Sequence, residues 1–410
     1  MKKMLRFMLL FSVPFILFSC HNNRAFNYNE AVEVAELQVA AMLNNLDEPG
    51  CYPRTVTSDG ELYCTGMTDW TEGFFPGSLW YLYELSNSDF FKRKAVKWTE
   101  HLEPMKNVTH HHDIGFIMYC SFGNAYRLTG NKKYRDILIE AANAAITRFS
   151  PEVGSIKSWN QRDAWDGETT WYYPVIVDNM MNLELLYFAT RETGDSTYYH
   201  IANEHAETTA RNNIRDDYGT YHVVNYDPDT GDVLHKQTCQ GFSDNSTWAR
   251  GQAWTIYGYV MAYRETGRED FLENALGLAD YFIQHPNLPQ DYIPYWDFNV
   301  DEYGYNPDWD YNPNRFDSIP RDASAAAITA SALLELSTLI DDGEYYFQFA
   351  EKQLRSLASS PYLAEPGTNN GFVLKHSVGS IPHNQEIDVP LVYADYYFLE
   401  AIQRYKNIKK

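Results

Sequence analysis

The chain has 410 residues, which at ~150 residues per domain favours two or three domains, although an all-helical toroid can use this length as one unit. Its 33 Lys and Arg against 55 Asp and Glu give a net charge of −22. This balance argues against nucleic-acid or acidic-membrane partners, which need a basic footprint, but it is compatible with a local cationic pocket for an anionic substrate. Aromatic residues make up 16% of the chain, which suits stacking on sugar rings as well as core packing.

The amino terminus has the pattern of an export signal. A basic start is followed by an apolar run over residues 7–18, which is too short to span a membrane. The next residues, Ser19 and Cys20, resemble the end of a bacterial lipoprotein signal, in which the new amino-terminal cysteine is lipidated; an ordinary signal peptide cut near Ser19 is the alternative. We therefore predict a signal peptide over residues 1–19, a tether over 20–29 and one catalytic domain over 30–410, anchored in the periplasm or outer membrane.

Four further cysteines follow the leader. Cys51 and Cys64 are close in sequence and can pair in an oxidising compartment, and the sequence leaves their pairing open. Cys120 lies in an apolar helical run, which is typical of a buried small side chain. No cysteine pair has the spacing of a metal finger, so thiol and zinc-finger chemistry are disfavoured.

Internal repeats dominate the body of the chain. An apolar helix, a polar turn and a second helix that opens on an aromatic residue recur at 83–91, 126–134, 190–198 and 263–271, with a degenerate fifth copy at 336–345. Gly130, Gly194 and Gly267 follow the first helix of their copies, where a left-handed cap favours glycine. Each copy therefore predicts a helical hairpin with a short link.

The two helices of a hairpin differ in pattern. The first is apolar on nearly all sides, as in residues 179–190 and 323–336, and such a helix is buried. The second is amphipathic, as in residues 134–149 and 271–282, and covers the first. With a first hairpin before residue 73 and a last inner helix near 389–405, six pairs fit, so we predict an all-α (α/α)6 toroid. A β-hairpin within residues 217–238 is expected as an insertion in its loops.

Polar residues gather in the segments that precede the inner helices. Each of these segments contains Asp, and most add Trp, His or Arg, at residues 67–74, 109–116, 173–180, 243–254, 319–324 and 383–390. Because all inner helices of a toroid start on one face, these residues should meet at one mouth. Helix amino termini would point at the same place and favour an anionic group there.

A structural role is the competing interpretation for each residue. Asp113, Asp178, Asp322 and Asp388 stand at expected helix starts, where Asp is a preferred N-cap. The row of histidines at 110–112 does not share one face, so it does not predict a metal site. The chain has no Gly-rich phosphate loop and no serine-hydrolase elbow. What remains is a set of carboxylates among aromatics with one arginine, which is typical of carbohydrate acid/base catalysis.

Three motifs in order resemble the unsaturated glucuronyl hydrolases of glycoside hydrolase family 88: HDIGF at 112–116, DNMMNLELLY at 178–187 and DNSTWARGQAW at 244–254. The resemblance runs from about residue 69 to the carboxyl terminus. It implies an (α/α)6 barrel without a metal or an organic cofactor. It also implies hydration of the C4=C5 double bond in the terminal uronic acid of lyase-generated oligosaccharides. The resulting hemiketal opens and releases the sugar behind it.

The resemblance also implies roles for individual residues. Asp178 is similar to the family's general acid/base and Asp113 to its essential partner. One carboxyl can protonate C4 and then deliver water to C5 if burial and a neighbouring carboxylate raise its pKa. Arg250 suits the C5 carboxylate because its guanidinium fork binds in a bidentate manner, and His222 should reach over the mouth from the inserted hairpin. The implied substrate contacts are Trp70, His112, His222, Thr238, Gln240, Trp248, Arg250 and Trp254.

One departure from the family concerns the aglycone. Members that prefer sulfated glycosaminoglycans carry a Ser-x-x-Ser-x-Lys pattern in a late loop; here Ser377 and Ser380 stand, but Pro382 replaces the lysine. The sequence therefore leaves open which sugar follows the unsaturated ring, and whether that sugar is sulfated. Two alternative functions are an unsaturated rhamnogalacturonyl or other glycuronan hydrolase of the same fold, and a surface glycan-binding lipoprotein that is not an enzyme.

Overall fold

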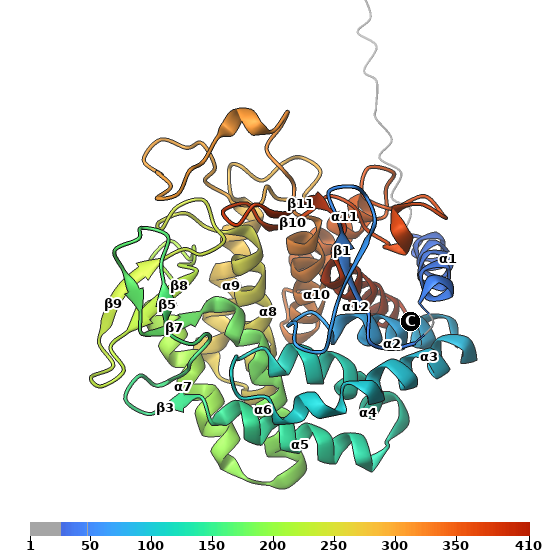
Figure 1. The fold of residues 1–410 in the computed structure, drawn as a ribbon, viewed down its shortest axis with the longest axis horizontal. Helices are drawn as coiled ribbons and strands as arrows, with labels where there is room; N and C mark the ends of the chain where they lie inside the picture. Colours follow the sequence, from blue (N-terminus) through green and yellow to red (C-terminus); the bar gives the residue numbers. More distant parts are fainter. Residues whose placement is uncertain (1–25, 47) are drawn as a thin grey trace, which may run out of the picture.

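The computed structural model of the chain describes residues 26–46 and 48–410, so the predicted signal peptide and Cys20 lie outside the described residues. Within them, helices alternate between an inner and an outer ring, and short strands and long loops gather at one side of the molecule (Figure 1). This architecture is the predicted (α/α)6 barrel. No helix in the described part of the chain combines the length and apolar character needed to cross a membrane.

The inner ring is closed. Each inner segment contacts the next, and the last helix contacts the first. In chain order the ring consists of α2 (Phe74–Ser86), the π-helix η2 (Gly115–Gly123) with α4 (Asn124–Thr129), the 3-10 helix η3 (Val177–Asn182) with α6 (Leu183–Thr193), α8 (Ala249–Thr266), α10 (Ala323–Leu339) and α12 (Val392–Ile408).

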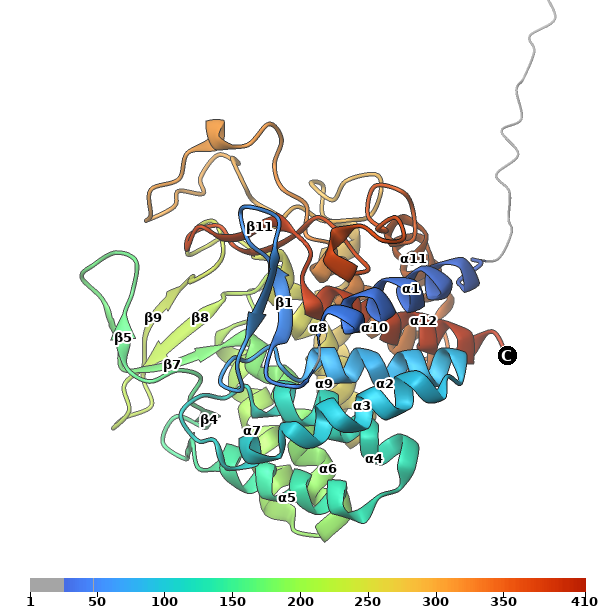
Figure 2. The same ribbon diagram turned by 45° about the vertical axis from the view of Figure 1, so that its right-hand side comes forward.

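The outer ring covers these helices with one face each. In α3, for example, the buried residues are Phe91, Ala95, Trp98 and Thr99, which share one side of the helix. Figure 2 shows α2 and α3 side by side as one such pair. The outer helices are α1 (Asn29–Asn45), α3 (Asp89–His101), α5 (Lys132–Ile146), α7 (Ser196–Asn212), α9 (Glu269–Gln284) and α11 (Glu344–Leu357).

The predicted caps are present at the ends of three inner helices. Gly130, Gly194 and Gly267 each adopt a left-handed conformation and donate their N–H to the carbonyl four residues earlier. The first copy uses Asn87 in the same conformation. Short links of this kind add few loop residues at the carboxyl ends of the inner helices, whereas long insertions precede their amino ends.

The predicted β-hairpin is confirmed and has a third strand. β8 (Val223–Tyr226) pairs with β9 (Val233–Gln237) on one side and with β7 (Tyr173–Ile176) on the other, all antiparallel. The smaller strand pairs are β1 (Tyr52–Val56) with β2 (Leu62–Thr65), β3 (Phe149–Ser150) with β4 (Ser155–Ile156), β5 (Arg162–Asp163) with β6 (Thr170–Trp171), and β10 (Ser377–Ser380) with β11 (Gln385–Val389). Short 3-10 turns occur at η1 (Glu103–Asn107), η4 (Pro313–Arg315) and η5 (Asn369–Gly371).

Two contacts order the amino-terminal part of the described chain. Phe26, within the predicted tether, is buried, and its ring packs edge-on against Tyr405 at a centroid distance of 5.5 Å. Cys51 and Cys64 form a disulfide that closes the β1–β2 hairpin, which answers the question that the sequence left open. Cys120 is buried, as predicted.

The prediction that Asp388 caps the last inner helix is wrong. α12 begins at Val392 after Leu391, and Asp388 lies in β11 with a left-handed φ of 57°. Its carboxylate contacts His376 Nδ1 at 2.6 Å. The reason is Pro390, which disfavours helical backbone at the preceding residue and so delays the helix start.

Candidate active site

The two acidic residues singled out from the sequence are held by adjacent inner helices. Asp113 lies just before η2, and Asp178 is the second residue of η3. The two helices touch where Gly115 packs against Asn182, whose side-chain oxygen accepts a hydrogen bond of 3.0 Å from the N–H of Phe116. Inner helices are close-packed at this point, so the separation of the two carboxylates is fixed by backbone contact.

Capping does not explain these two residues. Neither η2 nor η3 has a side-chain cap, whereas Asp322 does cap α10 by accepting hydrogen bonds from the N–H groups of Ser324 and Ala325. The structural interpretation therefore holds for Asp322 and fails for Asp113 and Asp178. Their carboxylates are free for another role.

Asp113 and Asp178 line one cavity of about 210 Å³ at the amino ends of the inner helices. Five further predicted site residues line it with them, from loops spread over most of the chain. These are Trp70, His112, Gln240, Arg250 and Ser380. The starts of the inner helices therefore meet at one mouth, as the sequence predicted.

The two carboxyls differ in their ionisation. Burial raises the pKa of Asp178 to about 7, opposed by the nearby Arg250 charge and reinforced by the charge of Asp113. For Asp113, burial also acts to raise the pKa, but His112, His111 and Arg148 outweigh it and hold the pKa below its usual value. His112 Nε2 is 3.3 Å from one oxygen of Asp113. One carboxyl thus stays ionised while the other exchanges a proton near neutral pH.

His222 is placed beside Asp178 by the sheet. The β7–β8 pairing continues one residue beyond the strands, because the N–H of Val177 donates a hydrogen bond to the carbonyl of His222. This bond holds His222 close to Asp178, the residue that follows Val177. The N–H groups of Cys239 and Gln240 donate to His222 Nδ1 at 3.1 and 3.2 Å. Burial lowers the pKa of His222. The neutral ring therefore carries its proton on Nε2, 3.7 Å from Asp178 Oδ2.

Arg250 is anchored by the protein through part of its guanidinium group. Its Nη1 bonds to Asp322 at 3.1 Å and to the carbonyl of Val378, and its Nη2 bonds to the carbonyl of Gly379 at 2.6 Å. Only its Nε, among the guanidinium nitrogens, lacks a partner within the described residues. Three of the five guanidinium N–H groups are thus used by the protein, and Arg250 fixes the β10 segment against α8 and α10. Its positive charge, its Nε–H and the second N–H of Nη2 remain for a ligand in the cavity.

The remaining predicted contacts lie behind the cavity wall. Trp248 packs between His222, at a ring distance of 4.5 Å, and the Arg250 guanidinium, at 4.4 Å. Trp254 is buried against Phe116 at 5.1 Å. Thr238 accepts a hydrogen bond from the N–H of Gly241 and shapes the loop. Ser377, at the start of β10, is fully buried.

Several unsatisfied polar atoms lie at or beside this site. A buried donor or acceptor without a partner costs about 1–3 kcal/mol, so a group of them calls for an explanation. Among the described residues with such atoms, which also occur elsewhere in the molecule, are His112, Asp178, His222, Trp248, Arg250, Trp254, Ser377 and Tyr393. A polar ligand that fills the cavity would satisfy such groups.

Several cavity residues escaped the sequence interpretation. Tyr393 is the second residue of α12, as Asp178 is of η3 and Arg250 of α8, so the same position in the helix could have indicated it. His383, Gln385 and Glu386 lie in the marked segment 383–390 but were given no role, and the others come from strands and turns that the helical repeat does not mark. The unpredicted lining side chains are Arg54, Trp159, Arg162, Ile176, Cys239, His383, Gln385, Glu386 and Tyr393.

A second, larger cavity of about 450 Å³ lies at the carboxyl ends of the inner helices. Its charges are paired with one another: Arg264 bonds to Glu184 at 2.5 Å, and Glu400 accepts hydrogen bonds from Tyr81 at 2.8 Å and Ser331 at 2.6 Å. Arg404 bonds to the carbonyl of Ser331 at 2.8 Å. This compensated network closes the far end of the barrel and lacks the cluster of free groups seen around Asp178.

The histidine row does not form a metal site. His112 faces the cavity, while His111 contacts Asp113 from the other side at 3.4 Å. In the part of the chain that the structure describes, no group of three or more His, Cys, Asp or Glu side chains is arranged to hold a metal ion.

Comparisons with known proteins point to one family. Residues 54–276 match the model of Glycosyl Hydrolase Family 88. The chain is 41% identical to an unsaturated glucuronyl hydrolase from Formosa agariphila, over 100% of this chain and 99% of that protein. A crystal structure of an unsaturated glucuronyl hydrolase specific for heparin shares 45% identity and a TM-score of 0.85, covering 93% of this chain and 98% of the other. A mutant of such an enzyme from Streptococcus agalactiae, complexed with dGlcA-GalNAc6S, shares 30% identity and a TM-score of 0.76, covering 94% and 93%.

These similarities support the glucuronyl hydrolase interpretation over the two alternatives, a rhamnogalacturonyl hydrolase and a glycan-binding lipoprotein without activity. The family match spans the β1–β2 hairpin, both site carboxylates and α8. The chain belongs to glycoside hydrolase family 88.

Proposed function

We propose that this chain hydrates the C4=C5 double bond of the unsaturated uronic acid at the non-reducing end of lyase-generated, glycosaminoglycan-type oligosaccharides. The observation that supports this proposal most is the pair Asp113 and Asp178 in one cavity, with the pKa of Asp178 raised to about 7. A carboxyl with this pKa is protonated often enough at neutral pH to act as an acid, and it is a competent base once it has lost its proton.

The chemistry follows from the enol-ether character of the double bond. Asp178 donates its proton to C4, and the positive charge that develops at C5 is shared with the ring oxygen. A water molecule then adds to C5 and returns a proton to Asp178. The product is a hemiketal at C5, which opens to a ketone and releases the next sugar with its hydroxyl. One water is consumed, and the carboxyl ends in its starting state.

The neighbouring groups have separate tasks in this proposal. Ionised Asp113 accepts hydrogen bonds from sugar hydroxyls, and its negative charge keeps the pKa of Asp178 high. His222, with Nε2–H toward Asp178 at 3.7 Å, is placed to orient the carboxyl or the attacking water. The Arg250 charge attracts the uronate carboxylate. Trp70, at an inner-helix start, supplies one of the aromatic rings of the cavity wall.

Substitution of Asp178 tests the assignment. Asp178→Asn keeps the shape but removes the transferable proton, so we expect loss of ultraviolet absorbance by an unsaturated disaccharide to slow by at least about 10²-fold. Asp388→Asn is a matched control, because Asp388 is exposed in β11 and does not line the cavity. Turnover at the wild-type rate in Asp178→Asn would remove Asp178 as the acid/base.

We also propose that the protein is exported and lipid-anchored through Cys20, on the pattern of residues 1–20. Cys20→Ser should move the protein from the membrane fraction to the soluble fraction without changing its specific activity. An unchanged distribution would contradict a lipid anchor.

A further inference from the structure

Two side chains at the outer part of the cavity have no task in the hydration step. Arg162 begins β5, is exposed, and its guanidinium lies over the rings of Trp159 and Trp171 at 5.2 and 5.8 Å. None of the described carboxylates lies within ion-pair distance of it, although the chain carries a net charge of −22. Stacking on two indoles holds the guanidinium at the cavity and leaves its N–H edge free.

His383 is the second side chain. It lies in the turn between β10 and β11 and lines the same cavity. Its Nδ1 is 2.6 Å from the Ser380 hydroxyl, which accepts a 3.4 Å hydrogen bond from the His383 N–H. Ser380 thus engages Nδ1, and Nε2 is the ring nitrogen left for a ligand; in the tautomer in which the hydroxyl donates to Nδ1, Nε2 carries the ring proton and is a donor. Burial and the nearby charge of Arg162 lower the pKa of His383, which agrees with a neutral ring close to that guanidinium.

The other two arginines of the cavity, Arg54 and Arg250, are paired with carboxylates. Arg54 also lines the cavity, but it is paired with Glu386 at 2.5 Å and with Asp69 at 2.5 Å, so its charge is neutralised. The inner end of the cavity carries Asp113 and Asp178, whereas Arg162 offers an uncompensated positive charge at the exposed end. A ligand that fits this polarity carries a second anionic group beyond its uronic acid ring.

We propose that Arg162 and His383 form a subsite for a sulfate ester on the sugar directly behind the unsaturated ring. This inference rests on the proposed function, because it assumes that the unsaturated ring occupies the inner end of the cavity. The second sugar of a glycosaminoglycan disaccharide is a hexosamine, which has no carboxylate, so a sulfate is the anion it can present. A guanidinium edge and an imidazole N–H are suitable donors for sulfate oxygens. The positive charge of this subsite comes from Arg162 in β5, because the late loop has Pro382 in place of the lysine.

The test compares pairs of unsaturated disaccharides that differ in one sulfate on the second sugar, at the 4-O, 6-O or N position. We expect wild-type kcat/KM to be higher for at least one sulfated member by roughly tenfold, the scale of one partly exposed charge-assisted hydrogen bond. Arg162→Ala should abolish that preference, mainly through KM, and change the unsulfated substrate by less than about twofold. His383→Ala should reduce the same preference, and added salt should weaken it in the wild type.

Arg211→Ala is the matched control, since it removes one positive charge from the outer helix α7, away from the cavity. Equal wild-type kcat/KM for all pairs would overturn the subsite while leaving the hydrolase intact. A parallel loss on sulfated and unsulfated substrates in Arg162→Ala would also overturn it, because it would place the guanidinium on the uronate ring. Absence of turnover on every member would instead refute the proposed function itself.

Discussion

Replacing Gly115 with alanine tests how closely the two site carboxylates must be held. A Cβ at this position would lie 2.5 Å from the Cα of Asn182 and 2.7 Å from its side-chain oxygen. Since carbon atoms in contact are ordinarily separated by about 3.5 Å, η2 and η3 would have to move apart by about 1 Å. Asp113 precedes this contact by two residues and Asp178 lies one helical turn before Asn182, so the movement separates the two carboxylates.

The expected effects are distinct and measurable. Overpacking should lower the free energy of unfolding by about 1–3 kcal/mol, and a misplacement of about 1 Å should reduce kcat by about 10²-fold. Chemical denaturation and loss of ultraviolet absorbance by an unsaturated disaccharide measure the two. Gly66→Ala is the control, because nothing lies within 4 Å of its added Cβ. Wild-type kcat in a folded Gly115→Ala enzyme would refute the idea that this contact sets the active geometry.

Three further predictions concern pH, a buried ion pair and the disulfide. Because Asp178 must be protonated to act, kcat/KM should fall as the pH rises through about 7; a rate that is constant from pH 6 to pH 8 would contradict this. Arg250→Met leaves Asp322 buried and uncompensated, so chemical denaturation should show a loss of about 3–5 kcal/mol, part of which an added Asp322→Asn recovers; loss below 1 kcal/mol would argue against the pair. Replacing Cys51 and Cys64 with serine opens a loop with a sequence separation of 13 and should lower stability by about 2–3 kcal/mol, and an unchanged denaturation midpoint would argue against the bond.

The helical repeat made the fold predictable in some detail. Glycine caps at 130, 194 and 267, together with the contrast between apolar and amphipathic helices, indicated both rings and their order. From this order alone, the starts of the inner helices had to meet, which is why Asp113 and Asp178 could be assigned to one cavity. The repeat determines which end of each inner helix faces the mouth of the barrel. This information was sufficient to place Asp113 and Asp178 together.

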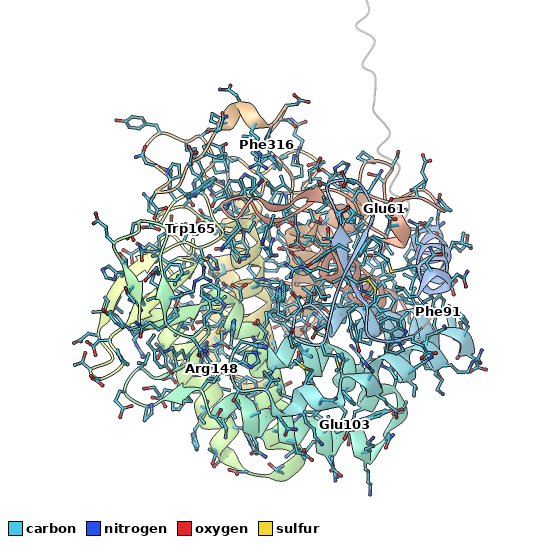
Figure 3. The ribbon with its side chains drawn as sticks, in the orientation of Figure 1. Glu61, Phe91, Glu103, Arg148, Trp165 and Phe316 are labelled. Atoms are coloured by element: carbon cyan, nitrogen blue, oxygen red, sulfur yellow. A yellow bond between two sulfur atoms is a disulfide. The ribbon has the colours of Figure 1, made fainter. Side chains whose placement is uncertain are left out.

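Residues from inserted loops could not be found in this way. Arg162 stands in a short hairpin without a repeating pattern, and His383, although it opens the marked segment 383–390, was given no role; the two meet because β5 and β10–β11 fold over the same mouth. In Figure 3, Trp165, whose ring packs 4.6 Å from that of His383, lies at the side of the molecule where the inserted strands and long loops gather. The partners of Arg250 were also hidden, because the carbonyls of Val378 and Gly379 carry no side-chain signal.

The direct test of the central claim is the titration of the Asp178 carboxyl itself. Carbon-13 NMR of protein labelled at the aspartate side-chain carbon, assigned by difference from Asp178→Asn, gives its midpoint without relying on turnover. We predict a midpoint of about 7, set by burial and the charge of Asp113. A midpoint near 4, the value of an unperturbed aspartate, would mean that the carboxyl holds no proton to donate at neutral pH, and the proposed hydration would lack its acid.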